Sequence, residues 1–349
     1  THCMRVDYNR VQETALDDSQ RGFRADADAG EAASVAVLQT EQAASLCVEA
    51  GRSYLDLKGF FMAINRGLMW ALEAELGVEP GVTRTMKLVH DAAQGVAHTR
   101  YGLTDAFKCL SGTGQGCVAA PVRATLNLLV IMSALLLHGD GFEFVAPPGA
   151  VMGLVKQEWF ADDLSAPARN AQGVQLSFDV AFYGSWVSGN VIGVDAQGRA
   201  TKSAYMLSVC GPDGRRGNDG YVIVLPTGEH VPRVHETYRL LGHEVGDSVG
   251  NSKSRDAFVY RARLATRLLS RLGGLELQSY GRLVDTLVVG LALYYGGPTP
   301  IDWPVAETVA KEVRKAAGRL GARALGGPRL QAHAPRDAGG LGLHHVYVH

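Results

Sequence analysis

Two adjacent carboxylates, Asp162 and Asp163, stand between apolar residues in the stretch Trp159–Leu164. Asp favours turns and the flanking residue types favour strands, so this stretch predicts the tip of a strand–turn–strand hairpin. Carboxylates held together repel each other, and a hard divalent cation such as Mg²⁺ would relieve that repulsion. The pair alone is a weak signal, because the adjacent Asp17 and Asp18 are interpreted as an ordinary solvated pair.

A third carboxylate lies far upstream of this pair. Asp56 is expected at the end of a short strand, residues 53–58, and the Gly-rich loop Gly112–Cys117 follows it and opens an apolar helix. This order is typical of a polymerase palm. Joining a nucleotide to a 3′-hydroxyl needs placement and charge neutralisation more than covalent help, and two divalent ions about 4 Å apart can supply both.

Seven short segments, in one order, resemble motifs of the reverse transcriptase domain of LINE-type (non-LTR) retrotransposons. Each match is weak alone, and together they cover essentially the whole chain. The segments are Gln20–Arg24, Leu55–Phe61, Gln115–Cys117 with Pro121, Phe160–Asp163, Thr201–Ser203, Tyr238–Gly242 and Gly339–Leu343.

The resemblance implies an α+β right-hand polymerase fold. Residues 1–50 are expected to form partial fingers, and residues 51–250 a palm with a small antiparallel sheet and the remaining fingers elements. Residues 251–349 are expected to form a helical thumb and the connection that follows it.

The resemblance also implies a catalytic and metal-binding set. Asp56 and Asp162 would be shared ligands of two Mg²⁺ ions, with Mn²⁺ as a possible substitute. Asp163 would be a secondary ligand, and the Leu57 carbonyl could add a backbone oxygen. Lys202 would neutralise or protonate the leaving pyrophosphate, although a solvated surface lysine is nearly as good an interpretation.

Substrate contacts are expected from five further residues. Phe61 would exclude a 2′-hydroxyl, with core packing beside Phe60 as the alternative. The Gly-rich loop would approach the incoming nucleotide and template base, since glycine admits close contact, with a plain helix-entry turn as the alternative. In that loop the expected residues are Gln115 and Gly116. The guanidinium groups of Arg21 and Arg24 would touch the triphosphate or the template backbone.

Nucleic-acid contacts are expected in the last part of the palm and in the thumb. Tyr238, Leu241 and Gly242 resemble a primer grip. Three arginines recur every four residues and therefore share one helix face, where they would touch duplex phosphates and read shape rather than sequence. A solvent face laced with ion pairs is the rival interpretation. The three are Arg263, Arg267 and Arg271.

Charge is distributed unevenly along the 349 residues. The net charge is −1, but residues 251–349 carry 14 Lys/Arg against 7 Asp/Glu, and the preceding residues carry the other 20 and 28. This asymmetry suggests that one part holds a polyanion and another holds metal, with a solvated helical surface as the equal alternative.

The chain is 46% hydrophobic, which favours a sizeable core. Its five cysteines show no CxxC spacing and are interpreted as reduced intracellular thiols.

Hydrophobic periodicity and turn residues predict the remaining elements. The apolar run Ala124–Leu137 is too short and too polar for a membrane span and predicts a buried helix. Helices are expected over 1–20, 31–50, 60–76, 82–96, from 121 onward, 174–186 and 255–272. Strands are expected over 53–58, 201–209, 221–225 and 238–245, with an extended stretch at 98–110 and a loop at 139–149.

The sequence therefore predicts an RNA-directed DNA polymerase with an RNA template, a DNA primer and dNTPs as partners. No membrane partner is expected, and the localisation is intracellular, in nucleus or cytoplasm. The chain begins without Met or a signal-like stretch and is interpreted as a fragment. Departures from the family pattern at Met62, Gly114 and Phe160 keep open an inactive remnant that retains the fold and only binds nucleic acid.

Overall fold

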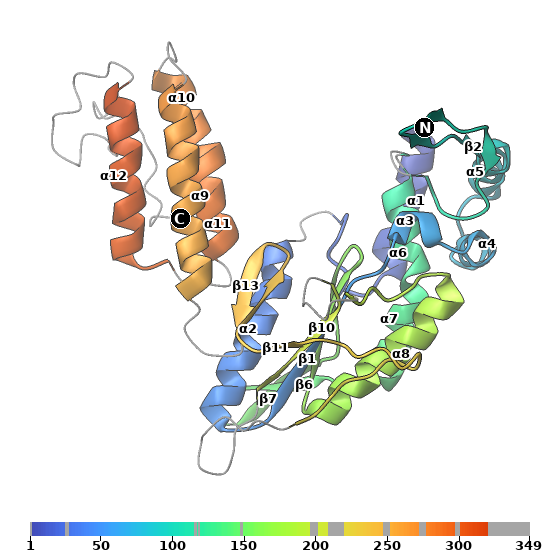
Figure 1. Cartoon of the computed structure of the whole chain (residues 1–349), viewed down its shortest axis with the longest axis horizontal. Coiled ribbons are helices and arrows are strands. Elements are labelled where there is room, and N and C mark those ends of the chain that lie inside the picture. Colours follow the sequence, from blue (N-terminus) through green and yellow to red (C-terminus); the bar gives the residue numbers. More distant parts are fainter. Residues whose placement is uncertain are drawn as a thin grey trace. The chain divides into compact units, whose positions relative to one another are not determined.

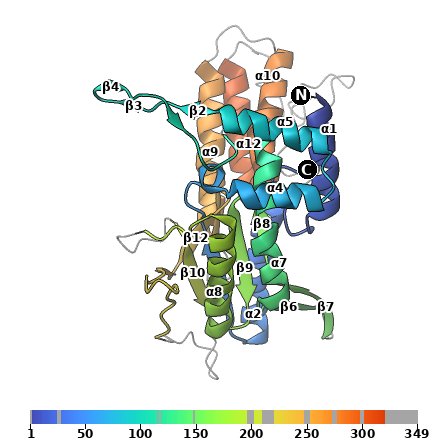
Figure 2. The same cartoon turned by 90° about the vertical axis from the view of Figure 1, so that its right-hand side faces the viewer.

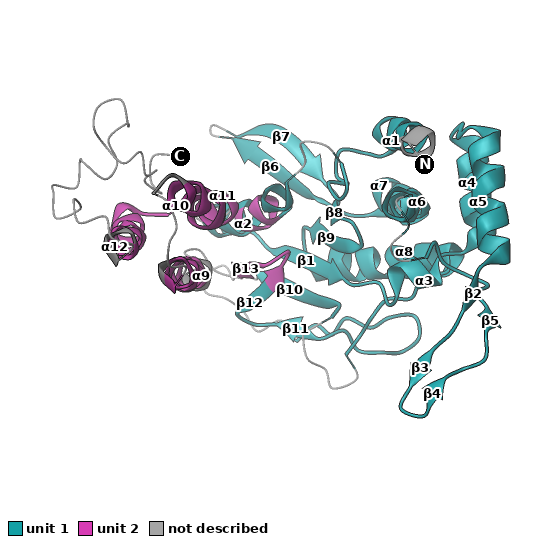
Figure 3. Cartoon of the chain, turned by 90° about the horizontal axis from the view of Figure 1, so that it is seen from above, with its two compact units in different colours: residues 1–32, 38–238 teal, residues 33–37, 239–349 magenta. Residues whose placement is uncertain are grey.

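The computed structural model describes residues 2–24, 28–114, 117, 119–146, 149–195, 202–208, 220–246, 252–271, 277–296 and 301–319. They fall into two compact units, coloured separately in Figure 3. Unit 1 comprises residues 1–32 and 38–238, and unit 2 comprises residues 33–37 and 239–349. The fold mixes helix and sheet, as expected for an α+β chain.

A five-stranded sheet with the order β11-β10-β1-β9-β8 forms the centre of unit 1. The central strand, β1, runs antiparallel to both of its neighbours, and all its residues are buried. Only β10 and β11 pair in parallel. The strands are β1 (Ala50–Leu55), β8 (Glu158–Phe160), β9 (Asp163–Ala168), β10 (Ala204–Ser208) and β11 (Arg233–Val234).

A buried arginine lies in the middle of β1. Arg52 donates from Nε to Gln39 Oε1 at 2.8 Å and from Nη1 to Ser165 Oγ at 2.7 Å. Burial lowers the pKa of Arg52 to about 10, and these polar partners make a charged residue tolerable inside a strand. Gln39 belongs to α2 (Ala29–Leu46), and its Nε2 also donates to the Gly51 and Ala168 carbonyls, at 2.9 and 3.2 Å.

Two helices cover one face of the sheet, as Figures 1 and 2 show. Helix α8 (Ala171–Ser188) packs on β1 and β9, and α7 (Leu129–His138) packs on α8. Together with α6 (Ala120–Asn127), α7 makes Ala120–His138, which among the described residues is long and apolar enough by composition to cross a membrane. Of that window 61% is buried, which is also how the core helix of a soluble protein behaves.

A charged cluster lies in the core beside α6, and we call it the Arg123 cluster: Arg123, Glu73, His90, Tyr8 and Trp70. The fully buried Arg123 donates from Nε to Glu73 Oε1 at 2.6 Å, and its Nη1 lies 2.7 Å from His90 Nε2. The Tyr8 hydroxyl donates to Glu73 at 3.0 Å, and the Arg123 guanidinium lies 4.4 Å from the Trp70 ring centre. The cluster joins α6 to α1 (His2–Ala15), α4 (Arg66–Glu75) and α5 (Pro80–Ala92).

The remaining elements of unit 1 are short. Helix α3 (Phe60–Ala63) follows β1 closely, and the β3–β4 hairpin projects away from α5 in Figure 2. Strands β6 and β7 form a separate hairpin. The strands are β2 (Gln94–Gly95), β3 (His98–Thr99), β4 (Gly102–Leu103), β5 (Phe107–Lys108), β6 (Phe142–Ala146) and β7 (Ala150–Val155).

Unit 2 is built mainly from helices around its own apolar core. Helix α9 packs on α11 and α12, and the core includes Phe258, Tyr280 and Val309. A π-helical segment, η1, joins α10 to α11 without a break. The elements are β13 (His243–Gly246), α9 (Ser252–Arg271), α10 (Leu277–Val284), η1 (Asp285–Val289), α11 (Gly290–Gly296) and α12 (Trp303–Arg319), with β12 (Thr237–Leu240) at the unit boundary.

Several predicted element boundaries are wrong. The helix expected to reach Ala50 ends at Leu46, because Cys47 adopts a left-handed conformation (φ 53°) and caps it, and Ala50 and Gly51 belong to β1. The helix expected over 60–76 is divided at Ile64 and Asn65, where Asn65 caps α4. The expected loop 139–149 contains β6, and the expected strand 221–225 holds only an isolated bridge at Val224.

Candidate functional site

Neighbouring strands bring the three predicted carboxylates to one end of the sheet. Asp56 directly follows β1, and Leu55 at the end of that strand is paired with Leu164 of β9. Phe160 of β8 pairs with Asp163 of β9, so only Ala161 and Asp162 form the turn of the predicted hairpin. Because β1 and β9 are adjacent, the end of one strand and the start of the other place Asp56, Asp162 and Asp163 together.

The three carboxylates affect one another electrostatically. Desolvation, then repulsion from Asp162 and Asp56, raises the pKa of Asp163 to about 6, although the residue as a whole is exposed. Desolvation likewise raises the pKa of Asp162, with repulsion from Asp56 adding to it. Negative charge is therefore concentrated beyond what the protein alone neutralises, and a cation would be attracted to this end of the sheet.

Lys202 supplies one positive charge to this group. Its Nζ lies 3.2 Å from Asp56 Oδ2 and 3.3 Å from Oδ1. The neighbouring Ser203 fixes this segment, since the Asp56 amide donates to Ser203 Oγ at 3.0 Å and the Ser203 amide donates to the Gly193 carbonyl at 2.9 Å. The predicted lysine thus reaches the predicted carboxylate as an ion pair, and it stays half-exposed.

The residues fit Mg²⁺ in chemical type but do not form a ready-made cage. Carboxylate oxygens are what this ion prefers, and the buried Asp56 Oδ2 is engaged by the Lys202 ammonium at 3.2 Å as an ion pair, with no hydrogen bond from the described residues. The residues on both sides of Leu57 form backbone hydrogen bonds with the segment 191–193. The Lys58 amide donates to the Val191 carbonyl and the Gly193 amide donates to the Asp56 carbonyl, while the Leu57 carbonyl takes part in neither bond. Within the described ranges, however, no three His, Cys, Asp or Glu side chains are grouped to hold a metal ion.

Tyr238 lies beside the carboxylates. Its ring stacks on Tyr54 of β1, with centroids 4.0 Å apart, and its hydroxyl donates to the Lys202 carbonyl at 3.1 Å. Desolvation raises the pKa of Tyr238, and the nearby Asp163 carboxylate adds to the effect. The expected primer-grip tyrosine therefore also holds the Lys202 segment against the central strand.

Phe61 lies next to the described part of the Gly-rich loop. The side chain is half-buried, meets Phe60 edge-on at 5.2 Å between centroids, and packs against the core of unit 1. Its carbonyl accepts from the Thr113 amide at 2.9 Å, and Gly112 takes a left-handed conformation (φ 82°) against this backbone. Phe61 thus packs beside Phe60, and its exclusion of a 2′-hydroxyl stays a prediction.

Several predicted residues lie outside the described ranges, namely Gln115, Gly116, Thr201 and Gly339–Leu343.

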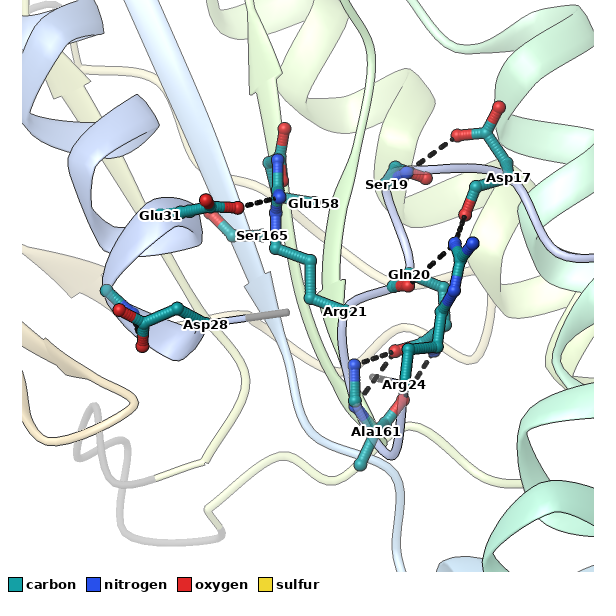
Figure 4. Close-up of polar contacts among 12 residues, drawn as sticks. Asp17, Ser19, Gln20, Arg21, Arg24, Asp28, Glu31, Glu158, Ala161 and Ser165 are labelled. Carbon is teal, nitrogen blue, oxygen red and sulfur yellow. Dashed lines mark hydrogen bonds and ion pairs between the residues drawn. The ribbon is translucent and has the colours of Figure 1, made fainter. Parts of the chain in front are cut away.

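The two arginines predicted to contact substrate are engaged within the protein. Arg21 pairs from Nε with Glu158 at 3.0 Å and through Nη1 with Glu31. Arg24 pairs with Glu13 at 3.1 Å and donates to the Asp17 carbonyl at 3.0 Å. Figure 4 shows both side chains on either side of the turn at Ala161. They brace this segment, and a substrate contact stays a prediction.

Gln20 is not among the predicted site residues, although the segment Gln20–Arg24 is one of the seven that resemble family motifs. The Gln20 side chain is fully buried and hydrogen-bonds both backbone polar groups of Ala161, the residue before Asp162 (Figure 4). Gly22 lies so close that a Cβ there would overlap the Ala161 nitrogen. We call Gln20, Arg21 and Gly22, with Trp159 and Ala161, the Gln20 brace.

The other expected grip residues form the tight turn between β12 and β13. Leu241 and Gly242 both have positive φ, 51° and 87°, which is typical of a two-residue hairpin turn and favours glycine at the second position. The Tyr294 hydroxyl of α11 donates to the Leu241 carbonyl, and a Cβ on Gly242 would meet that hydroxyl at 2.6 Å. The single strand expected over 238–245 is therefore a hairpin, and contact of its turn with a primer stays a prediction.

The arginine row lies on the solvent side of α9. Arg263, Arg267 and Arg271 are all exposed, as their spacing predicts. Leu264 and Leu268 beside them are about half exposed, and Tyr260 more so. An open groove along this helix is lined by Asp256, Val259, Tyr260, Arg263, Leu264 and Arg267. The face thus offers cations with apolar and aromatic surface between them.

Comparisons with known proteins give a structural likeness only. No protein-family model matches the sequence, and no curated protein matches it. Among solved structures, apo telomerase from Candida tropicalis is similar at 8% identity and a TM-score of 0.48, covering 91% of this chain and 55% of that one. Telomerase from Candida albicans with the TWJ fragment of telomeric RNA is similar at 10% identity and a TM-score of 0.43, covering 94% and 53%. The chain spans about half the length of these telomerases, and the likeness assigns no family.

Proposed function

We propose that this chain is an RNA-directed DNA polymerase of the reverse transcriptase type, derived from a LINE-type retrotransposon. The observation that carries the proposal is the gathering of Asp56, Asp162 and Asp163 at adjacent strand ends, where desolvation and mutual repulsion raise the pKa of both hairpin carboxylates. The order of the motifs along the chain adds to it. Template, primer and dNTPs are the proposed partners.

In this proposal the carboxylates would hold Mg²⁺, which neutralises charge on the phosphates when bound. Asp56 and Asp162 would share it and Asp163 would assist, with the Leu57 carbonyl as a backbone oxygen. A cation here would compete with the Lys202 ammonium for Asp56. Lys202, which pairs with Asp56, would neutralise or protonate the leaving pyrophosphate, and Phe61 would limit the space for a 2′-hydroxyl.

The thumb part of the proposal rests on the exposed arginine row of unit 2. Lys and Arg contacts to phosphates release counterions, so binding should weaken steeply as salt is raised. Tyr260, one turn before Arg263, adds an exposed aromatic surface to the same groove. These contacts would hold a duplex without reading its sequence.

A second candidate function is nucleic-acid binding without catalysis, by an inactive remnant. The specific observations that favour it are the Lys202–Asp56 ion pair and the lack, within the described residues, of three grouped metal ligands. Both are expected of a site that does not close on metal.

Primer extension on an RNA template with dNTPs and Mg²⁺ separates the two. Asp162→Ala should abolish incorporation while leaving the circular dichroism spectrum and duplex binding unchanged. Asp18→Ala is the matched control, since its side chain is fully exposed in the other Asp-Asp pair. Retained extension by Asp162→Ala would overturn the metal assignment. A folded, duplex-binding wild type without product would favour the remnant.

A further inference from the structure

The Gln20 amide holds both polar backbone groups of one turn residue. Its Nε2 donates to the Ala161 carbonyl at 3.1 Å, and its Oε1 accepts from the Ala161 amide at 3.1 Å and from the Gly22 amide at 2.8 Å. We infer that Gln20 is a positioning residue that sets the orientation of the Asp162–Asp163 turn, an inference that rests on the proposed function of those carboxylates.

The turn needs such support because of its backbone. Ala161 has φ 57°, in the left-handed region that is unfavourable for an L-residue other than glycine. Two hydrogen bonds from one planar amide fix the peptide groups on both sides of Ala161. The second of those peptide groups leads directly into Asp162, so its orientation decides where the first hairpin carboxylate points.

The amide is itself held firmly. The Trp159 amide donates to the Ser19 carbonyl at 2.7 Å, and the Arg21 amide donates to the Trp159 carbonyl at 2.9 Å, so residues 19–21 pair with β8. The Arg21–Glu158 ion pair adds a side-chain contact to the same strand. Gly22 completes the brace, because only a residue without Cβ fits against the Ala161 backbone.

A purely structural role is the alternative, and the chain offers a matched residue to test it. Gln39 is also buried and also makes three hydrogen bonds, two from Nε2 to carbonyls and one from Arg52 to Oε1. It belongs to α2 and contacts β1 and β9, not the hairpin turn. Gln39→Met loses as many hydrogen bonds as Gln20→Met, one of them from the buried Arg52, which keeps its bond to Ser165, and it leaves Ala161 untouched.

The experiment compares wild type, Gln20→Met and Gln39→Met by three measurements. These are amide hydrogen exchange of the segment 158–164, Mn²⁺ binding by loss of the free-ion paramagnetic resonance signal, and the kcat and KM for dNTP incorporation. In Gln20→Met we expect faster exchange at the turn, and a 10–100-fold loss of Mn²⁺ affinity and of kcat, the usual size for a residue that supports metal ligands. KM for dNTP should stay within about twofold, since the substitution changes the position of the carboxylates and not the ground-state binding of the nucleotide. Gln39→Met should leave all three near wild type.

Should Gln20→Met fail to fold, Gln20→Asn keeps a neutral amide but shortens the side chain by one methylene, so that it no longer reaches both polar groups of Ala161. It should show the same direction in all three measurements. Equal effects of the Gln20 and Gln39 variants, or unchanged Mn²⁺ binding in Gln20→Met, would overturn the positioning role. A wild type that binds Mn²⁺ through Asp162 but incorporates no dNTP would overturn the polymerase, and exchange and Mn²⁺ binding would still decide the role of Gln20.

Discussion

The Gln20 brace and the Arg123 cluster are both buried polar networks of unit 1, yet they hold different things. The Arg123 cluster joins charged and aromatic side chains from four helices. The Gln20 brace joins a neutral amide to the backbone of a single turn. A buried charge left without its partner is costly to the whole fold, whereas a lost neutral hydrogen bond costs less and acts locally. The first network should govern stability and the second the geometry of the carboxylates.

The largest effect is expected from Arg123→Met. Removing the guanidinium leaves Glu73 buried and uncompensated, and breaking such a pair costs about 3–5 kcal/mol of unfolding free energy. Urea denaturation followed by circular dichroism measures the loss. The double variant Arg123→Met with Glu73→Gln should recover part of it, since no charge is then stranded. A loss below about 1 kcal/mol in the single variant would show that the pair is not a main support of unit 1.

Gly22→Ala should have an intermediate effect on stability and a large one on the site. The added methyl would overlap the Ala161 backbone, so the turn must shift, at a cost of about 1–3 kcal/mol for overpacking. dNTP incorporation should fall about 10–100-fold with it. Gly153→Ala is the control, because a Cβ there meets nothing within 4 Å. Equal activity of the two variants would contradict the close approach.

His90 predicts how the Arg123 cluster responds to acid. Burial, then the positive charges of Arg123 and Arg66, lowers the pKa of His90 to about 4, while Asp91 opposes the shift. Since the folded value lies below the ordinary 6.5, the neutral ring stabilises the fold fully above that pH, and stability is lost as pH falls toward 4. The expected slope is on the order of 1 kcal/mol per pH unit, measured by urea denaturation. His90→Gln should flatten it, and an unchanged slope in that variant would assign the loss to other groups.

The smallest effect on stability is expected from Asp163→Asn. The pKa of Asp163 is raised to about 6, so its carboxylate disfavours the fold above that pH and the protonated form favours it below. Removing the charge should raise the unfolding free energy at pH 7 by only a few tenths of a kcal/mol, because water screens an exposed side chain. Thermal unfolding at pH 7 and pH 4 checks this, and a variant less stable than wild type at pH 7 would contradict it.

The sequence anticipated the elements whose signals are local. The hairpin around Asp162, the strand directly before Asp56 and the exposed arginine row of α9 all follow from turn propensity, strand propensity or a four-residue period. The ion pair between Lys202 and Asp56 was not foreseen, although both residues were assigned to the site. Its formation depends on the pairing of β1 with β10, which no local pattern reports.

The missed features depend on partners that lie far away in sequence. Nothing near Gln20 indicates that its side chain meets a residue 141 positions later. The early end of α2 was missed as well. Local propensity favours a glycine, here Gly51, as the left-handed residue that ends a helix, but in the structure Cys47 takes that conformation. Arg21 and Arg24 were assigned to substrate from their charge and from the resemblance of the segment Gln20–Arg24, and their acidic partners Glu158 and Glu13 are set by the fold.

The long separation between Gln20 and Ala161 also sets an order of folding. Closing a loop costs more conformational entropy as it lengthens, so contacts this distant in sequence form after local ones. During synthesis, the Gln20 segment, which follows α1, must wait until the hairpin has been made before it has a turn to brace. Pulsed hydrogen exchange during refolding should show the Ala161 amide protected later than the amides within α8. Incomplete chains would thus carry the first carboxylate, Asp56, long before they could assemble a site around it.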